Sequence, residues 1–295
     1  MSARSRQRGV ALITAVLVVA LATAIAATLT WELFLDQRRA QGRITVDQGL
    51  MYSLGAEAWA SQVLQDDAED NQVDHPREPW GLQITPLPIE GGQIQGRIED
   101  LNGRFNLNNL VDAAGATDPL ALETFRRLLQ NLDLDIRLAD RMADWIDRDP
   151  EPNFPDGAED AEYLSRQPPF RAANRPVTSP SEVLVVFPEL GAEGYARLRP
   201  YITALPEVLM STSESFGFTE AERIFLDQPE DGWQEVEQLG EMIPEDARAW
   251  LGVSSEWFRL SVRVDVGTQR FTMYSLLHRN PGGAVTTVIR SFADE

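Results

Sequence analysis

The chain opens with Met1-Ser-Ala-Arg-Ser-Arg-Gln-Arg-Gly9, and an uncharged stretch from Val10 to Trp31 follows. A helical residue rises about 1.5 Å, so about 22 residues span roughly 33 Å, enough to cross the hydrocarbon core of a bilayer. The arginines of the opening segment would stay on the cytoplasmic side, and Trp31 suits the opposite interface. This stretch predicts a membrane-crossing helix with its N-terminus inside the cell.

A cleaved secretory signal peptide is the main alternative to this anchor. Such a peptide has an apolar core of about 7–15 residues and a small-x-small cleavage site. Ala22-Thr23-Ala24 and Ala24-Ile25-Ala26 both have that form. The apolar pattern nevertheless continues through Leu35, and neither proline nor glycine occurs from Val10 to Gln41. A single long helix fits the whole segment better than a discarded leader.

The remaining chain predicts an α+β protein. Helical spacing of apolar residues continues to Gln65, the charged stretch 66–79 indicates a loop, and 82–86 and 92–99 indicate two strands. Further helices are expected at 119–132, 136–146, 181–186, 192–202, 220–226 and 235–241, and strands at 257–265, 269–277 and 284–290. This order predicts a long N-terminal helix packed on a small antiparallel sheet, with a large α-helical domain inserted.

Composition argues against nucleic-acid binding and against several kinds of enzyme. The chain has 26 basic and 46 acidic side chains, so its net charge of −20 repels phosphate backbones. It has no cysteine, and therefore neither a disulfide nor a thiolate nucleophile. His75 and His278 offer no zinc-binding pair and are expected at the surface, and no phosphate-binding loop or nucleophile elbow occurs. No catalytic residue is predicted.

One cluster has the composition of a metal site. Asp140, Asp144 and Asp147 recur at i, i+4 and i+7, which places three carboxylates on one face of a helix. A Pro/Gly-rich stretch then adds further acidic residues: Asp149, Glu151, Asp156, Glu159 and Asp160. Crowded anions are unfavourable without a cation, and Ca²⁺ prefers oxygen ligands, although the spacing is not that of an EF-hand. A solvated acidic loop is the alternative.

Several stretches together resemble a known family. The basic leader ending at Gly9, the segment Val10-Ala-Leu-Ile-Thr14 and the long apolar helix are similar to type IV prepilins and type II secretion pseudopilins. Most members of that family carry glutamate where this chain has Thr14, and the K-type minor pseudopilin lacks it. Three internal blocks also resemble the K type: Asp100-Leu-Asn-Gly-Arg-Phe-Asn-Leu-Asn-Asn-Leu110, Gly157-Ala-Glu-Asp160 through Pro168-Pro-Phe-Arg171, and Ser179-Pro-Ser-Glu-Val183.

The resemblance implies a subunit of a secretion machine. A prepilin peptidase would cut after Gly9 and leave Val10 as the N-methylated first residue of a chain anchored once in the bacterial inner membrane, with its bulk in the periplasm. Thr14 cannot supply the charge that pairs with a subunit above. The resemblance therefore implies a position at the tip of the periplasmic pseudopilus. It also implies a part in initiating pseudopilus assembly for protein export across the outer membrane. The implied partners are the I-type and J-type minor pseudopilins of a tip complex, the major pseudopilin, the prepilin peptidase, the inner-membrane assembly platform and secreted substrates.

The resemblance further implies structural Ca²⁺, because K-type pseudopilins bind calcium in their helical domain. The expected ligands are Asp147, Asp149, Asp156, Glu159 and Asp160. The expected organisation is a leader (1–9), a transmembrane and assembly helix (10–65), a pilin-like sheet in two parts (66–105 and 207–295) and the inserted α-helical domain with its acidic loop (106–206). A membrane-anchored periplasmic hydrolase and a secreted calcium-binding protein remain the alternatives.

Overall fold

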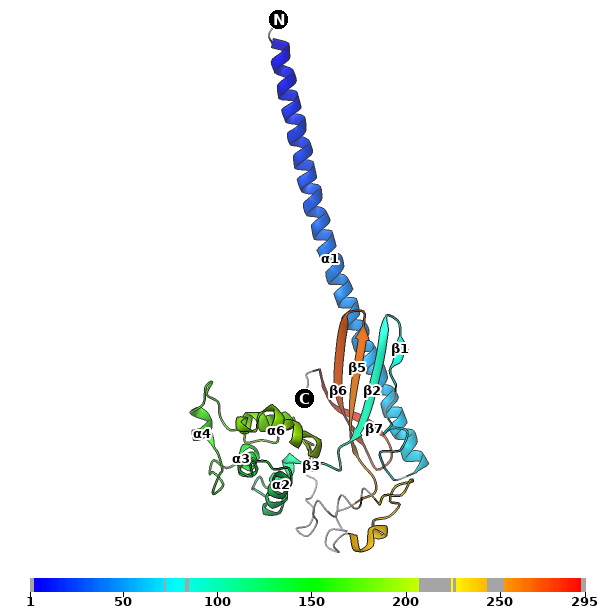
Figure 1. The fold of residues 1–295 in the computed structure, drawn as a ribbon, viewed down its shortest axis with the longest axis vertical. Coiled ribbons are helices and arrows are strands. Elements are labelled where there is room, and N and C mark those ends of the chain that lie inside the picture. The colour runs from blue at the N-terminus through cyan, green and yellow to red at the C-terminus, as the bar shows by residue number, and fades with distance from the viewer. Residues whose placement is uncertain are drawn as a thin grey trace.

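Helix α1 (Ala3–Asp70) dominates the shape of the molecule. The computed structural model describes residues 3–71, 73–82, 85–206, 224, 227–242 and 252–292, without the side chains of residues 3–11, 241 and 242. The N-terminal part of α1 stands clear of everything else (Figure 1), which confirms the predicted single long helix. Within the described chain, one helix is long and apolar enough to cross a membrane. The loop expected at 66–79 begins later than predicted, because α1 continues to Asp70.

A five-stranded antiparallel sheet lies along the C-terminal part of α1 (Figure 1). Its strands, in spatial order, are β1 (Leu87–Ile89), β2 (Gly92–Asp100), β5 (Trp257–Val266), β6 (Gln269–Arg279) and β7 (Val285–Ser291). Side chains alternate between buried and less buried along β5, as a sheet with one covered face requires. The three C-terminal strands are confirmed. Of the strand expected at 82–86, residues 83 and 84 lie outside the described residues, and 82, 85 and 86 are not in a strand; β1 begins at Leu87.

A stripe of small and apolar residues joins α1 to this sheet. Its buried members are spaced three or four apart along the helix: Gly49, Ser53, Glu57, Ala60 and Leu64. At Gly49 the helix lies so close to β6 that a Cβ would come within 2.4 Å of the Phe271 ring. The Glu57 carboxylate accepts hydrogen bonds from Ser275 Oγ at 2.6 Å and Arg290 Nη2 at 2.7 Å. Close packing and the Glu57–Arg290 ion pair therefore dock this part of the helix.

The inserted domain lies beside the sheet, between β2 and β5 in the chain (Figure 1). It begins at β3 (Phe105–Asn106) and ends at β4 (Ile202–Thr203), which pair in parallel and bring its two ends together. The elements between them are η1 (Leu107–Leu110), α2 (Pro119–Asn131), α3 (Arg137–Ile146), α4 (Asp160–Leu164), η2 (Pro180–Glu182), α5 (Val183–Val186), η3 (Pro188–Leu190), α6 (Gly191–Leu198) and η4 (Arg199–Tyr201). They enclose their own apolar core, which includes Phe125, Met142 and Tyr163.

Most predicted helices of this region are present, with corrected ends. The helix expected at 192–202 is α6 as far as Leu198 and continues as the 3-10 helix η4 to Tyr201, because β4 begins at Ile202. Residues 156–160 are not all loop, since α4 begins at Asp160. The segment expected at 235–241 is a 3-10 helix, η5 (Val236–Met242), and the helix expected at 220–226 falls almost wholly outside the described residues.

Asparagines of the 100–110 block hold together the segments that enter and leave the inserted domain, and one of them also bonds to the sheet. Asn108 donates from its side-chain amide to the carbonyls of Val177 at 3.0 Å and Leu205 at 2.8 Å, and it accepts from the Val177 N–H at 2.8 Å. Asn106 Oδ1 accepts from the Leu205 N–H at 3.0 Å. Asn102 Oδ1 in turn accepts from the first residue of β5. This block therefore forms the junction through which the chain enters and leaves the domain.

Candidate functional site

Three buried carboxylates lie near one another where α3 ends and α4 begins. Asp144 and Asp147 come from the end of α3, and Glu159 precedes α4; their relative exposures are 0%, 1% and 7%. Asp147 Oδ1 and Glu159 Oε1 are buried and accept no hydrogen bond from the described residues. A buried carboxylate oxygen without a donor is costly, so this arrangement calls for a positive partner.

The raised pKa values of these carboxyl groups also indicate that the site needs a positive partner. Burial is the main cause that raises the pKa of Asp147 to about 7, and the charges of Asp144 and Asp149 add to it. The pKa of Glu159 is also raised to about 7, by burial first and then by the neighbouring carboxylates, including Asp160. Desolvation and like charges both disfavour the ionised form. A bound cation would stabilise the ionised carboxylates and so offset both the desolvation and the repulsion between like charges.

The loop after α3 folds back onto Asp144. The Asp144 carboxylate accepts the Asn153 N–H at 3.1 Å and also the Asn153 side-chain amide. Asn153 donates to Thr117 Oγ1 at 2.9 Å, and Thr117 Oγ1 donates to Asp147 Oδ2 at 3.3 Å. Gly157 is required here, because a Cβ at that position would lie 2.2 Å from Asp144 Oδ2. The chain thus wraps the carboxylates closely.

The predicted ligands divide into two groups. Asp147 and Glu159 lie together, and Asp149, which is exposed, acts on the pKa of both. Asp160 instead faces Arg171, at 3.5 Å, and accepts the Ala172 N–H at 3.1 Å. Asp156 acts electrostatically on Asp140 and Arg137 rather than on the buried group. The ligand set of Asp147, Asp149, Asp156, Glu159 and Asp160 itself stays a prediction.

Sequence reasoning left Asp144 out of that set. It occurs at i, i+4 with Asp140 and precedes Asp147 by three residues, so helical spacing placed all three on one face. The structure separates them: Asp140 pairs with Arg126 Nη2 at 2.6 Å, whereas Asp144 faces the loop. The missing signal was the position of Arg126, which comes from another helix, α2.

The donor set fits a hard divalent cation. Carboxylate oxygens are the ligands that Ca²⁺ prefers, and two of those present have an unused lone pair in a buried position. Asp144, Asp147 and Glu159 would hold such an ion, which would supply positive charge and cross-link α3 to the loop before α4. Its effect would be structural, because metal binding to folded ligands adds to folding free energy.

The N-terminal part of α1 provides a different kind of surface. Gly9, Val10 and Thr14 lie within one uninterrupted helix. Beyond them the apolar side chains are uncovered: Leu17 is 65% exposed and Leu33 is 71% exposed. In water such a surface would be unfavourable, so it belongs in a bilayer or against other helices. It fits a single-pass anchor.

Known proteins of one family resemble this chain. A family model for the "Type II secretion system (T2SS), protein K" matches residues 103–207. Type II secretion system protein K of Pseudomonas aeruginosa is 33% identical, over 97% of this chain and 93% of its own length. The corresponding protein of Pectobacterium carotovorum is 32% identical, over 98% and 97%. A chain of the GspK–GspI–GspJ complex from enterotoxigenic Escherichia coli superposes with a TM-score of 0.77 at 27% identity, covering 87% of this chain and 100% of that one.

A long helix docked on an antiparallel sheet, with a helical domain inserted, defines the class as pilin-like. The chain belongs to the family of type II secretion system protein K. It is a minor pseudopilin of a type II secretion system, a component of a protein-transport apparatus. The predicted family, fold class and pseudopilin role are thereby confirmed.

Proposed function

We propose that this subunit caps the tip of the periplasmic pseudopilus and helps to initiate its assembly for protein export across the outer membrane. The observation that carries the proposal is the inserted domain, which projects from the side of the helix–sheet unit (Figure 1). Closely repeated subunits in a shaft would collide with a domain of this size, whereas a terminal subunit has room for it. Thr14 supports the same position, because it offers no carboxylate to a subunit above.

The proposed tip position implies which proteins contact this subunit. The similar Escherichia coli chain was solved in complex with GspI and GspJ. By analogy, the I-type and J-type minor pseudopilins form the tip complex with this chain, and the major pseudopilin continues below it. The inner-membrane assembly platform and secreted substrates are further partners. The exposed apolar surface of α1 is the contact for neighbouring helices.

A single labelled position tests the tip assignment. The chain has no cysteine, so a Phe154→Cys variant carries one thiol, at a side chain that is 93% exposed in the inserted domain. Assembled pseudopili are treated with a maleimide-linked gold particle and imaged by electron microscopy. One particle at one end of each filament is expected, and the unsubstituted chain is the control. Particles spread along the shaft would disprove the tip position.

The second part of the proposal concerns processing and location. Prepilin peptidase cuts between Gly9 and Val10, and the chain is anchored once in the inner membrane with its bulk in the periplasm. The basic flank and the uncovered apolar helix support this. Mass spectrometry of the mature N-terminus should find N-methylated Val10, and a Gly9→Leu variant should keep residues 1–9. An intact leader would favour an anchored periplasmic hydrolase, and loss of the whole helix a secreted calcium-binding protein.

The third part concerns calcium and catalysis. The inserted domain binds structural Ca²⁺ through Asp144, Asp147 and Glu159, with Asp149 nearby, and the chain has no enzymatic role. The orphaned oxygens of Asp147 and Glu159 support the metal. A structural role agrees with the family, whose members are components of the transport apparatus. Thermal unfolding tests the calcium part: Ca²⁺ should raise Tm, and Glu159→Gln should weaken this response.

A further inference from the structure

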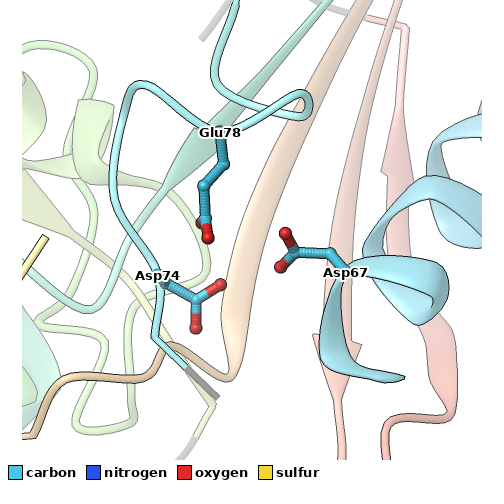
Figure 2. A group of neighbouring side chains, drawn as sticks. All are labelled: Asp67, Asp74 and Glu78. Atoms are coloured by element: carbon cyan, nitrogen blue, oxygen red, sulfur yellow. The ribbon is translucent and has the colours of Figure 1, made fainter. Parts of the chain in front are cut away.

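A second group of buried carboxylates lies outside the inserted domain. Asp67 comes from the end of α1, and Asp74 and Glu78 come from the segment that follows; Figure 2 shows the three converging. One oxygen from each lies within 4.8 Å of the others. Their side chains are 8%, 1% and 7% exposed. This group was not predicted from the sequence, in which 66–79 looked like an ordinary charged loop.

The charges of this group do not balance. Arg279 of β6 contacts Asp67 Oδ2 through Nη1 at 3.0 Å and Asp74 Oδ2 through Nη2, and its side chain is 7% exposed. One guanidinium therefore faces three carboxylates, which leaves two negative charges in excess. The remaining basic group that contacts the cluster in the described chain is His75, whose Nε2 lies 3.9 Å from Glu78 Oε1. His75 was expected at the surface, and this was wrong: its side chain is 11% exposed.

One oxygen of the group has no hydrogen-bond donor. Asp74 Oδ2 accepts from Arg279 and from the Ser255 N–H at 2.6 Å, but Asp74 Oδ1 is buried and accepts nothing from the described residues. Glu78, in contrast, is held rigidly by the Trp80 indole N–H at 2.8 Å and by the His75 N–H at 2.9 Å. A buried carboxylate oxygen without a donor is costly, and a bound cation would remove this cost.

The ligand chemistry of the group suits calcium. Calcium binds carboxylate oxygens at about 2.3–2.6 Å and tolerates irregular ligand arrangements, whereas magnesium requires a near-ideal octahedron. One oxygen of each carboxylate lies within 4.8 Å of the others, so one calcium ion can contact all three. An open cleft of about 900 Å³ reaches Asp67 and Glu78, and other acidic residues line it, among them Asp70 and Asp231. An acidic cleft concentrates cations at its floor.

We propose that Asp67, Asp74 and Glu78 form a calcium site that fastens the end of α1 to the sheet. The ion neutralises the excess charge that Arg279 leaves and joins the last turn of α1 to the 74–78 segment, while Arg279 ties both to the end of β6. The site is separate from the carboxylates of the inserted domain, which belong to another core. It does not depend on the tip position of the subunit.

The test isolates this site from the one in the inserted domain. The full-length chain in detergent carries Asp147→Asn and Glu159→Gln in all variants, so that the first group is neutralised. Thermal unfolding is followed in Ca²⁺ and in chelator. Ca²⁺ is expected to raise Tm of this background by several degrees, and adding Asp67→Asn should abolish the rise. Asp70→Asn is the matched control, because Asp70 lines the same cleft without belonging to the cluster, and it should keep the response.

Two further results distinguish the site from a general effect of negative charge. In chelator, Asp67→Asn should not lower Tm, since it removes one of three crowded charges. A Ca²⁺ response that Asp67→Asn and Asp70→Asn reduce equally would overturn the proposal, as would a background without any response. Should the background fail to fold, terbium luminescence of the unsubstituted chain decides. Trp80 contacts Glu78, so Trp80→Phe should remove a Ca²⁺-displaceable part of the sensitised emission, and unchanged emission would refute the site.

Discussion

The strongest prediction concerns Glu159 in the absence of calcium. In the metal-free protein, burial and then the charges of Asp144 and Asp147 raise the pKa of Glu159 from 4.5 to about 7. One pKa unit corresponds to about 1.4 kcal/mol, so holding Glu159 ionised costs about 3 kcal/mol of folding free energy. The pKa of Asp147 is raised in the same direction, but the two costs do not add, because each carboxylate forms part of the other's surroundings.

The sign of the pH dependence follows from the raised pKa. The folded, metal-free protein binds the Glu159 proton more tightly than the unfolded chain does. Glu159 therefore costs no stability below about pH 4, and its cost grows as pH rises from there to about 7. Between pH 5 and pH 8 in chelator, a loss of about 3 kcal/mol should lower Tm by about 6–12 °C for a folded part of this size. Calcium should remove most of this loss, because it neutralises the same charges.

The assay is thermal unfolding, followed by tryptophan fluorescence, at several pH values with Ca²⁺ or chelator. Glu159→Gln should unfold at a higher temperature than the unsubstituted chain in chelator at pH 8, and should respond less to Ca²⁺. Glu151→Gln removes an exposed carboxylate from the same loop and should leave both values unchanged. Equal unfolding temperatures of Glu159→Gln and the unsubstituted chain in chelator, or a Ca²⁺ effect that is the same at pH 5 and pH 8, would show that Glu159 is not a destabilising buried charge.

Three other substitutions test the packing, each by its effect on the free energy of unfolding. Gly49→Ala should cost about 1–3 kcal/mol, because its Cβ would overlap the Phe271 ring, whereas the same change at Gly55, which has open space, should stabilise by up to about 1 kcal/mol. Arg290→Ala should cost about 2 kcal/mol, less than for a fully buried pair because Arg290 is half-exposed; a cost near zero would contradict an ionic tie. Asn108→Ala should cost about 2–3 kcal/mol by leaving buried backbone groups unpaired, and Asn108→Asp should not restore stability.

Local patterns were sufficient for the elements of the fold. An unbroken apolar run determines α1 whatever surrounds it, and alternation determined β5, β6 and β7, because both depend on neighbouring residues alone. Errors occurred at ends, where competing contacts decide. α1 continues to Asp70, since Asp67 near its end contacts Arg279 of β6.

The long helix, the order of strands and helices, and the crowding of carboxylates between 140 and 160 all follow from the amino-acid sequence. Which carboxylates have a cationic partner depends on the folded arrangement. Arg126 of α2 pairs with Asp140, whereas Asp144 and Asp147 have no cationic partner among the described residues, and Arg279 of β6 satisfies only part of the group at the end of α1. These partners are distant in the chain, so their charges meet only after the sheet and the inserted domain have folded, and spacing along the sequence carries no signal of them.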